Sequence, residues 1–163
     1  MTNTKELYRE MIRYYQGDPK RIQHFVKVHS FAMLIGEGEK LDSHTLLILS
    51  AAALVHDIGI KPAEKKYGSC GGKLQEQEGP EPAKEILQRL GFSEDVTRRV
   101  CYLVSKHHTY TEVDGIDYRI LLEADFLVNA YEDGLSEESV KAAMDKFFRT
   151  ETGIAILKDM YHL

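Results

Sequence analysis

The chain has 163 residues, a net charge of −5 and 43% hydrophobic residues, which fits one domain with a substantial core that needs no disulfide support. Its lysines and arginines are scattered, which argues against a nucleic-acid polymer as a partner, and two cysteines, Cys70 and Cys101, are too few for a disulfide framework. Because the N-terminal segment MTNTKELYREMIRYY lacks the apolar core of a signal peptide, we expect a cytoplasmic protein without a membrane span and with a single domain over residues 1–163.

Two helices are predicted in the first quarter of the chain. Residues 4–16 carry apolar side chains at helical spacing and stop at Gly17, which predicts a helix that packs against the core and takes no part in chemistry. Asp18 and Pro19 then form an N-cap followed by a proline at the first helical position. A second helix is therefore expected to continue to about Gly36.

The second helix directs a histidine toward the core. His24 lies in line with three apolar residues at helical spacing, Val28, Ala32 and Ile35. His29 is rotated from this line by roughly 140°. A lone histidine in such a place is usually satisfied by a backbone carbonyl, so His24 becomes a candidate site residue only if other polar groups join it.

The most apolar stretch of the chain runs directly into two polar residues. In LLILSAAALVHDIGI, residues 46–60, a run of apolar or small residues precedes His56 and Asp57. This run is apolar on every side and too short to span a bilayer, so it predicts a central buried helix that starts near Asp42 or Ser43. An unpaired buried carboxylate is strongly unfavourable, and a metal ion is the partner that best relieves it.

The following segment, KPAEKKYGSCGGKLQEQEGPEP, covers residues 61–82 and mixes lysines, glycines and prolines. This composition predicts an irregular loop with about one helical turn. Lys61 is the one lysine near enough to the histidine–aspartate pair to meet an anionic substrate. Glu76 and Glu78 precede a predicted helix over Glu81–Leu90, where the helix dipole alone favours acidic residues.

A pair of histidines ends the next predicted helix. Ser93 caps this helix, whose buried stripe of apolar residues ends at His107, with His108 on its flank. Histidines at a helix C-terminus can simply stabilise the last turn by their charge. The alternative is that the pair lies over a metal site.

The last predicted helices include one more buried carboxylate. In YRILLEADFLVNAYE, residues 118–132, Asp125 shares a face with apolar residues while Glu123 points the other way. Two amphipathic helices, Ser136–Phe148 and Thr152–Tyr161, follow and are expected to cover the core.

Four separate stretches thus place polar side chains on the inward side of a helix or at a helix end. These residues are His24, His56, Asp57, His107, His108 and Asp125. Imidazole and carboxylate ligands without thiolates suit Mn, Fe, Mg or Zn, and ligands from several helices can enclose an ion inside a bundle.

Three short patterns, in this order, resemble the HD-domain superfamily of metal-dependent phosphohydrolases. They are the first histidine of HFVKVHSFA, the histidine–aspartate pair in ALVHDIG and the aspartate preceded by alanine in LLEADFL. The likeness covers about residues 19–131, with residues 1–17 and 136–163 as flanking helices. It implies an all-α fold, a compact multi-helix bundle whose central buried helix carries the pair. It also implies a divalent metal ion held by His24, His56, Asp57 and Asp125.

The reaction implied by the resemblance is hydrolysis of a phosphate ester or anhydride of a small metabolite, with a nucleotide as the expected partner. Cations and proton donors stabilise phosphoryl oxygens, so His107, His108 and Lys61 are the candidate catalytic residues. Family members that hold two metal ions usually have a further histidine between the pair and the later histidines. The segment KLQEQEGPEP contains none, so the resemblance implies one metal ion unless Glu76 or Glu78 substitutes. The GYP signature of the cyclic-dinucleotide phosphodiesterases is also absent. The alternatives are a non-catalytic nucleotide-binding or sensor module and a helical protein whose polar groups merely satisfy one another.

Overall fold

Every regular element in the described part of the chain, residues 2–163 of this computed structural model, is a helix. In chain order the helices are α1 (Thr2–Tyr14), α2 (Pro19–Gly38), α3 (Ser43–Val55), α4 (Ile60–Tyr67), α5 (Gly72–Glu78), α6 (Pro80–Arg89), α7 (Glu94–Val104), α8 (Ile116–Glu132), α9 (Glu137–Phe147) and α10 (Glu151–Tyr161). The predicted all-α fold is confirmed.

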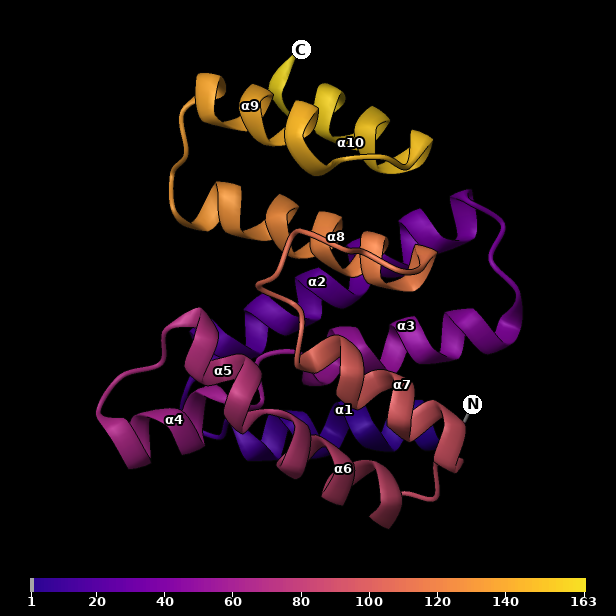
Figure 1. The fold of residues 1–163 in the computed structure, drawn as a ribbon, viewed down its shortest axis with the longest axis vertical. Coiled ribbons are helices and arrows are strands. Elements are labelled where there is room, and N and C mark those ends of the chain that lie inside the picture. Colours follow the sequence, from indigo (N-terminus) through magenta and orange to yellow (C-terminus); the bar gives the residue numbers. More distant parts are fainter. Residues whose placement is uncertain (1) are drawn as a thin grey trace.

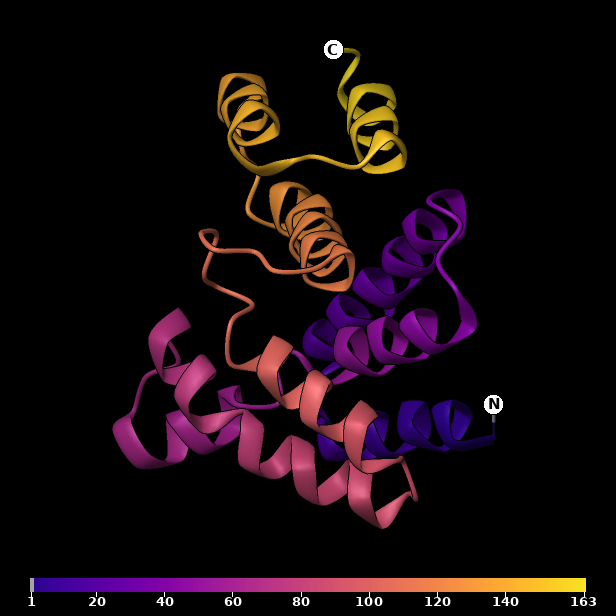
Figure 2. The same cartoon turned by 45° about the vertical axis from the view of Figure 1, so that its right-hand side comes forward.

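Helix α3 lies at the centre of the bundle, in contact with α1, α2, α7 and α8. Helix α2 packs along both α3 and α8, which are far apart in the sequence. Figures 1 and 2 show α9 and α10 beyond α8 at one end of the molecule, and α1, α4 and α6 at the other end. Helices from the start, middle and end of the chain therefore meet around α3.

Side-chain caps start the two helices that carry the first predicted site residues. The Asp18 carboxylate accepts a hydrogen bond from the Arg21 amide at 3.2 Å, and Asp42 accepts one from the Thr45 amide at 2.9 Å. Such acceptors satisfy amides that have no partner within the first helical turn. Helix α2 continues to Gly38, slightly beyond its predicted end.

Helix α3 is the predicted central buried helix, and its residues 48–55 are all buried. The helical stretch Ser43–Tyr67, which runs through α3 and α4, is long and apolar enough by composition to cross a membrane. However, 72% of its most apolar 18 residues is buried inside the protein. A helix that is apolar on all sides and covered by other helices is typical of a protein core.

The segment 61–82 is more regular than its composition predicts. In place of an irregular loop it contains most of α4, all of α5 and the start of α6. Pro62 lies in the first turn of α4, where its missing amide hydrogen is no loss, and Gly68 ends this helix with a φ of 68°. Helices this short depend on packing against their neighbours, which local periodicity does not reveal.

Glu123 points to a different side of α8 from Asp125, as predicted, but that side is buried as well. Its side chain is fully buried on the side of α8 that faces the junction of α9 and α10. The carboxylate accepts hydrogen bonds from the amides of Arg149 at 2.6 Å and Thr150 at 3.0 Å, just before α10 begins. Helix α8 is thus covered on two sides, so its pattern of apolar residues does not define one outer face.

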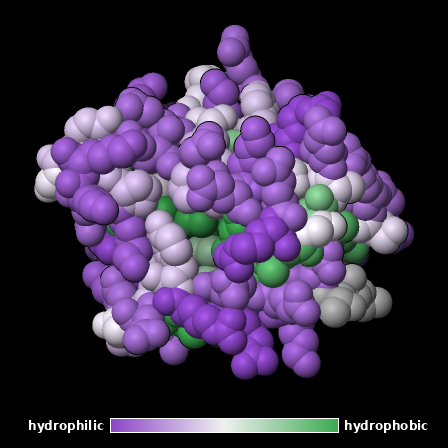
Figure 3. All heavy atoms as spheres, turned by 90° about the horizontal axis from the view of Figure 1, so that it is seen from below, coloured by the Kyte–Doolittle hydropathy of each residue, from purple (hydrophilic) through white to green (hydrophobic). Residues whose placement is uncertain are grey.

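The face of the molecule that carries α1 and α6 is mostly hydrophilic, with apolar residues gathered in recesses (Figure 3). A recess of about 190 Å³ on this side is lined by residues of α1, of α6 and of the turn after α3, including Tyr14, Ile58 and Ile86. Helix α1 therefore lies next to the turn that carries the histidine–aspartate pair.

Candidate metal centre

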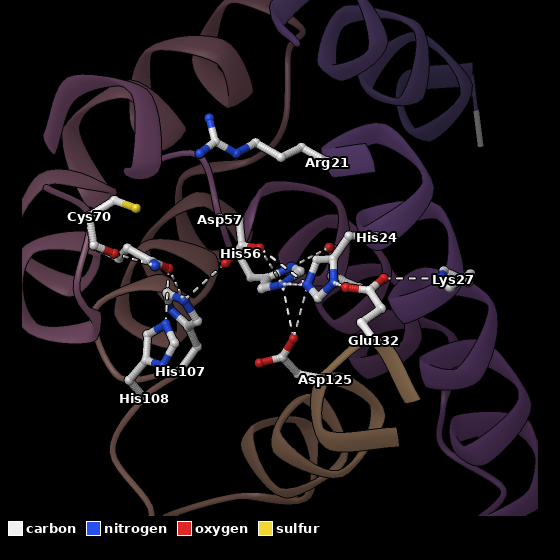
Figure 4. Close-up of polar contacts among 12 residues, drawn as sticks. Arg21, His24, Lys27, His56, Asp57, Cys70, His107, His108, Asp125 and Glu132 are labelled. Atoms are coloured by element: carbon white, nitrogen blue, oxygen red, sulfur yellow. Dashed lines mark hydrogen bonds and ion pairs between the residues drawn. The ribbon is translucent and has the colours of Figure 1, made fainter. Parts of the chain in front are cut away.

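Three helices bring four of the predicted site residues to one place. His24 lies on α2 and Asp125 on α8, while His56 and Asp57 follow the end of α3. Figure 4 shows the side chains of these residues pointing toward one another between the helices. Buried apolar residues of the same helices surround them, which fixes the backbone positions from which the side chains extend.

The donor atoms of these residues lie at contact distance. His24 Nε2 is 3.2 Å from His56 Nε2 and 3.2 Å from Asp57 Oδ2. The distance from His24 Nε2 to Asp125 Oδ1 is also 3.2 Å. His56 Nε2 lies 3.3 Å from each of the same two carboxylate oxygens. The structure thus brings together the four residues that the resemblance implies as ligands.

Hydrogen bonds at the other ring nitrogen determine how both histidines face this cluster. His24 Nδ1 lies 3.0 Å from Glu132 Oε2, and His56 Nδ1 lies 2.7 Å from the carbonyl oxygen of Ala53. A carboxylate and a carbonyl only accept, so each Nδ1 donates, and the Nε2 of a neutral ring keeps its lone pair. Nitrogen lone pairs and carboxylate oxygens therefore face one another, which is unfavourable unless positive charge lies between them.

Without a metal ion, protons must supply that charge. Burial acts to lower the pKa of His24, but the negative charges of the Asp125 and Asp57 carboxylates beside its Nε2 outweigh it and raise the pKa to about 10. Burial likewise opposes the charge of His56, yet the two carboxylates hold its pKa well above the usual value. Burial acts to raise the pKa values of Asp57 and Asp125, and the histidines lower both. The cluster therefore favours a bound cation.

The spacing of the donors fits a divalent metal ion. Ligand atoms about 2.1 Å from an ion, in right-angled or tetrahedral arrangement, are separated by roughly 3.0–3.4 Å. The Nε2 atoms of His24 and His56 lie 3.2–3.3 Å from each other and from the Asp57 and Asp125 oxygens, and the donors of His24, His56 and Asp57 all lie within 4.8 Å of one another. Asp125 Oδ1 is also buried and has no hydrogen-bond partner among the described residues. We refer to these four residues as the first donor group.

A second donor group shares Asp57 with the first. His107 lies in the turn after α7, and its Nδ1 is 2.7 Å from the carbonyl oxygen of Val104, so Nε2 is its free nitrogen. This Nε2 lies 3.4 Å from Asp57 Oδ1, and donor atoms of Asp57, His107 and His108 lie within 4.8 Å of one another. Because Asp57 Oδ2 faces the first group and Oδ1 the second, Asp57 stands between them.

Gln75 completes the second donor group, and no motif in the sequence indicates it. Its side-chain oxygen lies 3.2 Å from His107 Nε2 and 2.9 Å from His108 Nε2. The amide nitrogen donates to the carbonyl of Cys70 at 2.7 Å, which orients the oxygen toward the histidines. Gln75 lies on α5, within the segment that offers no histidine. Its burial is the one signal that distinguishes it from Gln77, the other glutamine of that segment, and burial follows only from the fold.

Glu76 and Glu78 direct their carboxylates elsewhere. Glu76 accepts hydrogen bonds from the amide of His108 at 3.1 Å and from the hydroxyl of Thr109 at 2.8 Å, so it supports the histidine-bearing turn. Glu78 pairs with Lys66 at 2.7 Å. The oxygen that reaches the second donor group comes from the neighbouring glutamine.

Lys61 contacts the C-terminal end of α1 in this structure. Its ammonium group donates to the carbonyl of Tyr14 at 2.5 Å and lies 4.8 Å from the centre of the Tyr14 ring. A cation is favourable there because it meets the C-terminal end of α1. Helix α4 begins at Ile60 and carries Lys61 to its outer side, so the structure gives no support to the predicted contact with an anion.

A cleft of about 270 Å³ opens beside the first donor group and is lined by Asp18, Lys20, Arg21, His24 and Glu132. Of the first donor group, His24 lines this cleft, next to Glu132, which contacts its Nδ1. A larger cleft of about 450 Å³ lies between α6 and α7, and none of the donor residues lines it. The smaller cleft is therefore the one relevant to the metal centre.

These features define an all-helical protein built around a histidine–aspartate metal centre. The HD domain family matches residues 21–148, so the chain belongs to that family, whose members bind divalent metals. A crystal structure described as a predicted HD superfamily hydrolase, from an uncultured Thermotogales bacterium, is similar over 97% of this chain and 84% of that chain, with a TM-score of 0.69 and 27% identity. No curated protein matches the chain. The family and this similarity support a metal-dependent hydrolase.

Proposed function

We propose that the protein is a phosphohydrolase that cleaves a phosphate ester or anhydride of a small metabolite, and that nucleotides are the first substrates to test. The convergence of the first donor group carries the proposal, because two imidazole nitrogens lie 3.2–3.3 Å from each other and from two carboxylate oxygens, an arrangement that a cation between them stabilises. Membership of the HD domain family and the similar hydrolase structure agree with this reaction class.

When bound, a divalent ion supplies the Lewis acidity and positive charge that hydrolysis of a phosphate ester needs. His24, His56, Asp57 and Asp125 would hold this ion. The residues around them keep the donors in place, since Nδ1 of each histidine is occupied by a hydrogen bond and the rings cannot turn without breaking it. We infer that a substrate approaches from the cleft that His24 and Glu132 line.

We further propose a second ion position formed by Asp57 Oδ1, His107, His108 and the side-chain oxygen of Gln75. The sequence favours one ion because a histidine is missing from the segment before α6, and Gln75 offers an oxygen ligand there. In this arrangement His107 serves as a ligand, because its Nδ1 is occupied by the carbonyl of Val104. The catalytic roles of His107 and His108 stay predictions.

Metal analysis combined with a phosphate-release assay tests the function. The purified full chain is stripped with a chelator, reconstituted with Mn, Fe, Zn or Mg, and assayed with p-nitrophenyl phosphate and with nucleoside mono-, di- and triphosphates. We expect metal-dependent turnover by the wild type and loss of both metal and turnover in Asp57→Ala. The control is His44→Gln, at an exposed position paired with Asp95, which should behave as the wild type.

Two results would contradict the phosphohydrolase. One is a wild-type protein that takes up no metal after reconstitution, and the other is turnover that persists after the metal has been removed. Tight nucleotide binding without turnover would select the sensor module instead. The assay therefore separates an enzyme from a binding protein that uses the same fold.

A further inference from the structure

The histidines of the two donor groups differ in what holds their Nδ1 atoms. His56 donates to the carbonyl of Ala53 and His107 to the carbonyl of Val104, each at 2.7 Å. Both acceptors are neutral backbone groups at the end of the preceding helix. His24 instead lies with its Nδ1 3.0 Å from a carboxylate oxygen of Glu132. Among these three histidines, His24 alone has an anionic partner at Nδ1.

The position of Glu132 follows from helix geometry. Glu132 is the last residue of α8 and comes seven residues after Asp125, which is about two helical turns, so both side chains leave α8 on the same side. Helix α2 packs against that side. Asp125 and Glu132 thus both reach His24 from α8. Asp125 contacts Nε2 of the ring and Glu132 contacts Nδ1 (Figure 4).

The second carboxylate oxygen of Glu132 is occupied as well. Oε1 lies 3.0 Å from the ammonium group of Lys27, which is one turn after His24 on α2. The Glu132 side chain is 18% exposed and that of Lys27 is 39% exposed. Lys27 therefore holds the carboxylate from the solvent side, while the other oxygen faces the imidazole.

The negative charge of a carboxylate makes it a stronger hydrogen-bond acceptor than a neutral carbonyl, although the 3.0 Å contact of His24 is longer than the 2.7 Å contacts of His56 and His107. When the carboxylate accepts from Nδ1, it fixes the tautomer and the orientation of the ring and makes the opposite nitrogen a better electron-pair donor. For His24 the opposite nitrogen is Nε2, the atom that contacts all three other members of the first donor group. The charge of Glu132 thus strengthens the ligand at the ion position by way of the His24 imidazole.

On this basis we propose that Glu132 is a positioning residue that holds His24 with Nε2 toward the ion and thereby tightens metal binding. The inference rests on the proposed metal centre and adds a residue that no motif contains. A carboxylate that served only as the surface partner of Lys27 would contribute little, since exposed ion pairs are weak. The two roles differ in a measurable way, because only the contact with His24 changes the affinity for a metal.

The test measures the Kd of the full chain for Mn²⁺ and Zn²⁺ by competition with a chromophoric chelator, and the Tm of each metal-free variant. We expect Glu132→Gln to weaken binding about tenfold and Glu132→Ala up to about a hundredfold, the range found when outer partners of metal ligands are removed. The metal-free Tm should stay within a few degrees of the wild type. The visible spectrum of bound Co²⁺ should also change, because it reports ligand geometry.

Two controls separate the contact with His24 from other effects of charge. Glu64→Gln removes a carboxylate that pairs with Arg21 beside the same cleft but contacts none of the donors, and it should keep the wild-type Kd. Lys27→Gln removes the ion pair and leaves Glu132 opposite His24, so binding should change less than threefold.

The proposal is overturned if the wild type binds metal and both Glu132 variants bind it equally well. It is also overturned if Lys27→Gln weakens binding as much as Glu132→Ala, or if a lower metal-free Tm accompanies the whole loss of affinity. A wild type that binds no metal would instead remove the metal centre itself, and with it the proposed function.

Discussion

Each ligand histidine in this protein uses its two ring nitrogens for different tasks. In His56 and His107, Nδ1 donates to a carbonyl three residues earlier, which leaves Nε2 free to face the donor groups. The sequence shows that both residues follow an apolar helical stripe. It does not show which nitrogen faces inward, because that depends on the turn in which the helix ends.

The donor atoms of Asp57 lead to a prediction about metal stoichiometry. We expect His107→Ala to keep one equivalent of metal and lose the second, because only the Oδ1 side of Asp57 loses a neighbour. Turnover should fall by about 10² or more, as expected when a group next to the reacting centre is removed. Elemental analysis of the reconstituted variant gives the stoichiometry. Two full equivalents in His107→Ala would show that His107 is not a ligand.

His29 leads to a prediction about pH. Its ring lies between the hydroxyls of Tyr8 at 2.9 Å and Ser50 at 2.8 Å, and burial lowers its pKa to about 4. The unfolded chain, with a histidine pKa near 6.5, binds more protons than the folded chain between these values. The contribution of His29 to stability is therefore complete above about pH 6.5 and is lost as the pH falls toward 4.

Urea unfolding at pH 7 and pH 5 measures this contribution. We expect the wild type to lose more of its unfolding free energy than His29→Gln between the two pH values, because glutamine does not titrate. His44→Gln, which removes an exposed histidine outside the core, is the matched control. Parallel losses in the wild type and His29→Gln would show that other groups dominate this pH range.

At the scale of the helices, α1 has more than the packing role predicted from its sequence. The Tyr15 hydroxyl donates to the carbonyl of Asp57 at 2.5 Å, and the Tyr14 hydroxyl donates to that of Ile58 at 3.0 Å. The ammonium group of Lys61 reaches back to the end of α1 from the other side of the turn. The C-terminus of α1 therefore holds the backbone that carries Asp57.

Tyr15→Phe tests this support. The change removes one hydroxyl and leaves a carbonyl of the turn without its partner, which should reduce the unfolding free energy by about 1–3 kcal/mol. Metal binding should weaken as well, because the Asp57 side chain depends on this backbone. Urea unfolding and a metal titration measure the two effects. Tyr131→Phe, at a position that is 75% exposed, should change neither.

Gly59 occupies a place where two segments approach closely. A Cβ atom at this position would lie 2.5 Å from the carbonyl oxygen of Gln75 and 2.8 Å from the amide nitrogen of Gly79. We expect Gly59→Ala to destabilise the fold by about 1–3 kcal/mol or more and to displace the neighbouring donors. Gly71→Ala is the control, because a Cβ there meets no atom within 4 Å. Equal stability of the two variants would show that the turn can shift freely.

At the scale of the whole molecule, the metal should be part of the stability of the fold. An ion that binds only the folded chain adds about 2.7 kcal/mol when its free concentration is a hundred times its Kd. For a domain of this size, this corresponds to roughly 5–10 °C in Tm. Thermal unfolding with and without a chelator measures the shift. Asp57→Ala should show no response to metal, and a wild type with the same Tm in both conditions would contradict the centre.

The main helices and the inward direction of His24 and Asp125 could be predicted because they depend on local patterns, while the set of four donors followed from the resemblance to the HD family. Caps such as Asp18 and apolar stripes around His24 and Asp125 depend on nearby residues, so the sequence is enough to find them. Gln75 and Glu132 could not be found this way. Their roles come from contacts with residues far away in the chain, 32 positions for Gln75 with His107 and 108 positions for Glu132 with His24.

The distribution of donors along the chain has a consequence for biosynthesis. As the ribosome releases the chain, the first part to emerge offers His24 alone, then the His56–Asp57 pair, and the first donor group is complete only when Asp125 has emerged. A nascent segment with one or two nitrogen or oxygen ligands holds metals weakly and without preferred geometry. Selection among cellular metals is therefore made by the finished bundle, so the ion that it carries depends on which metals are available where folding is completed.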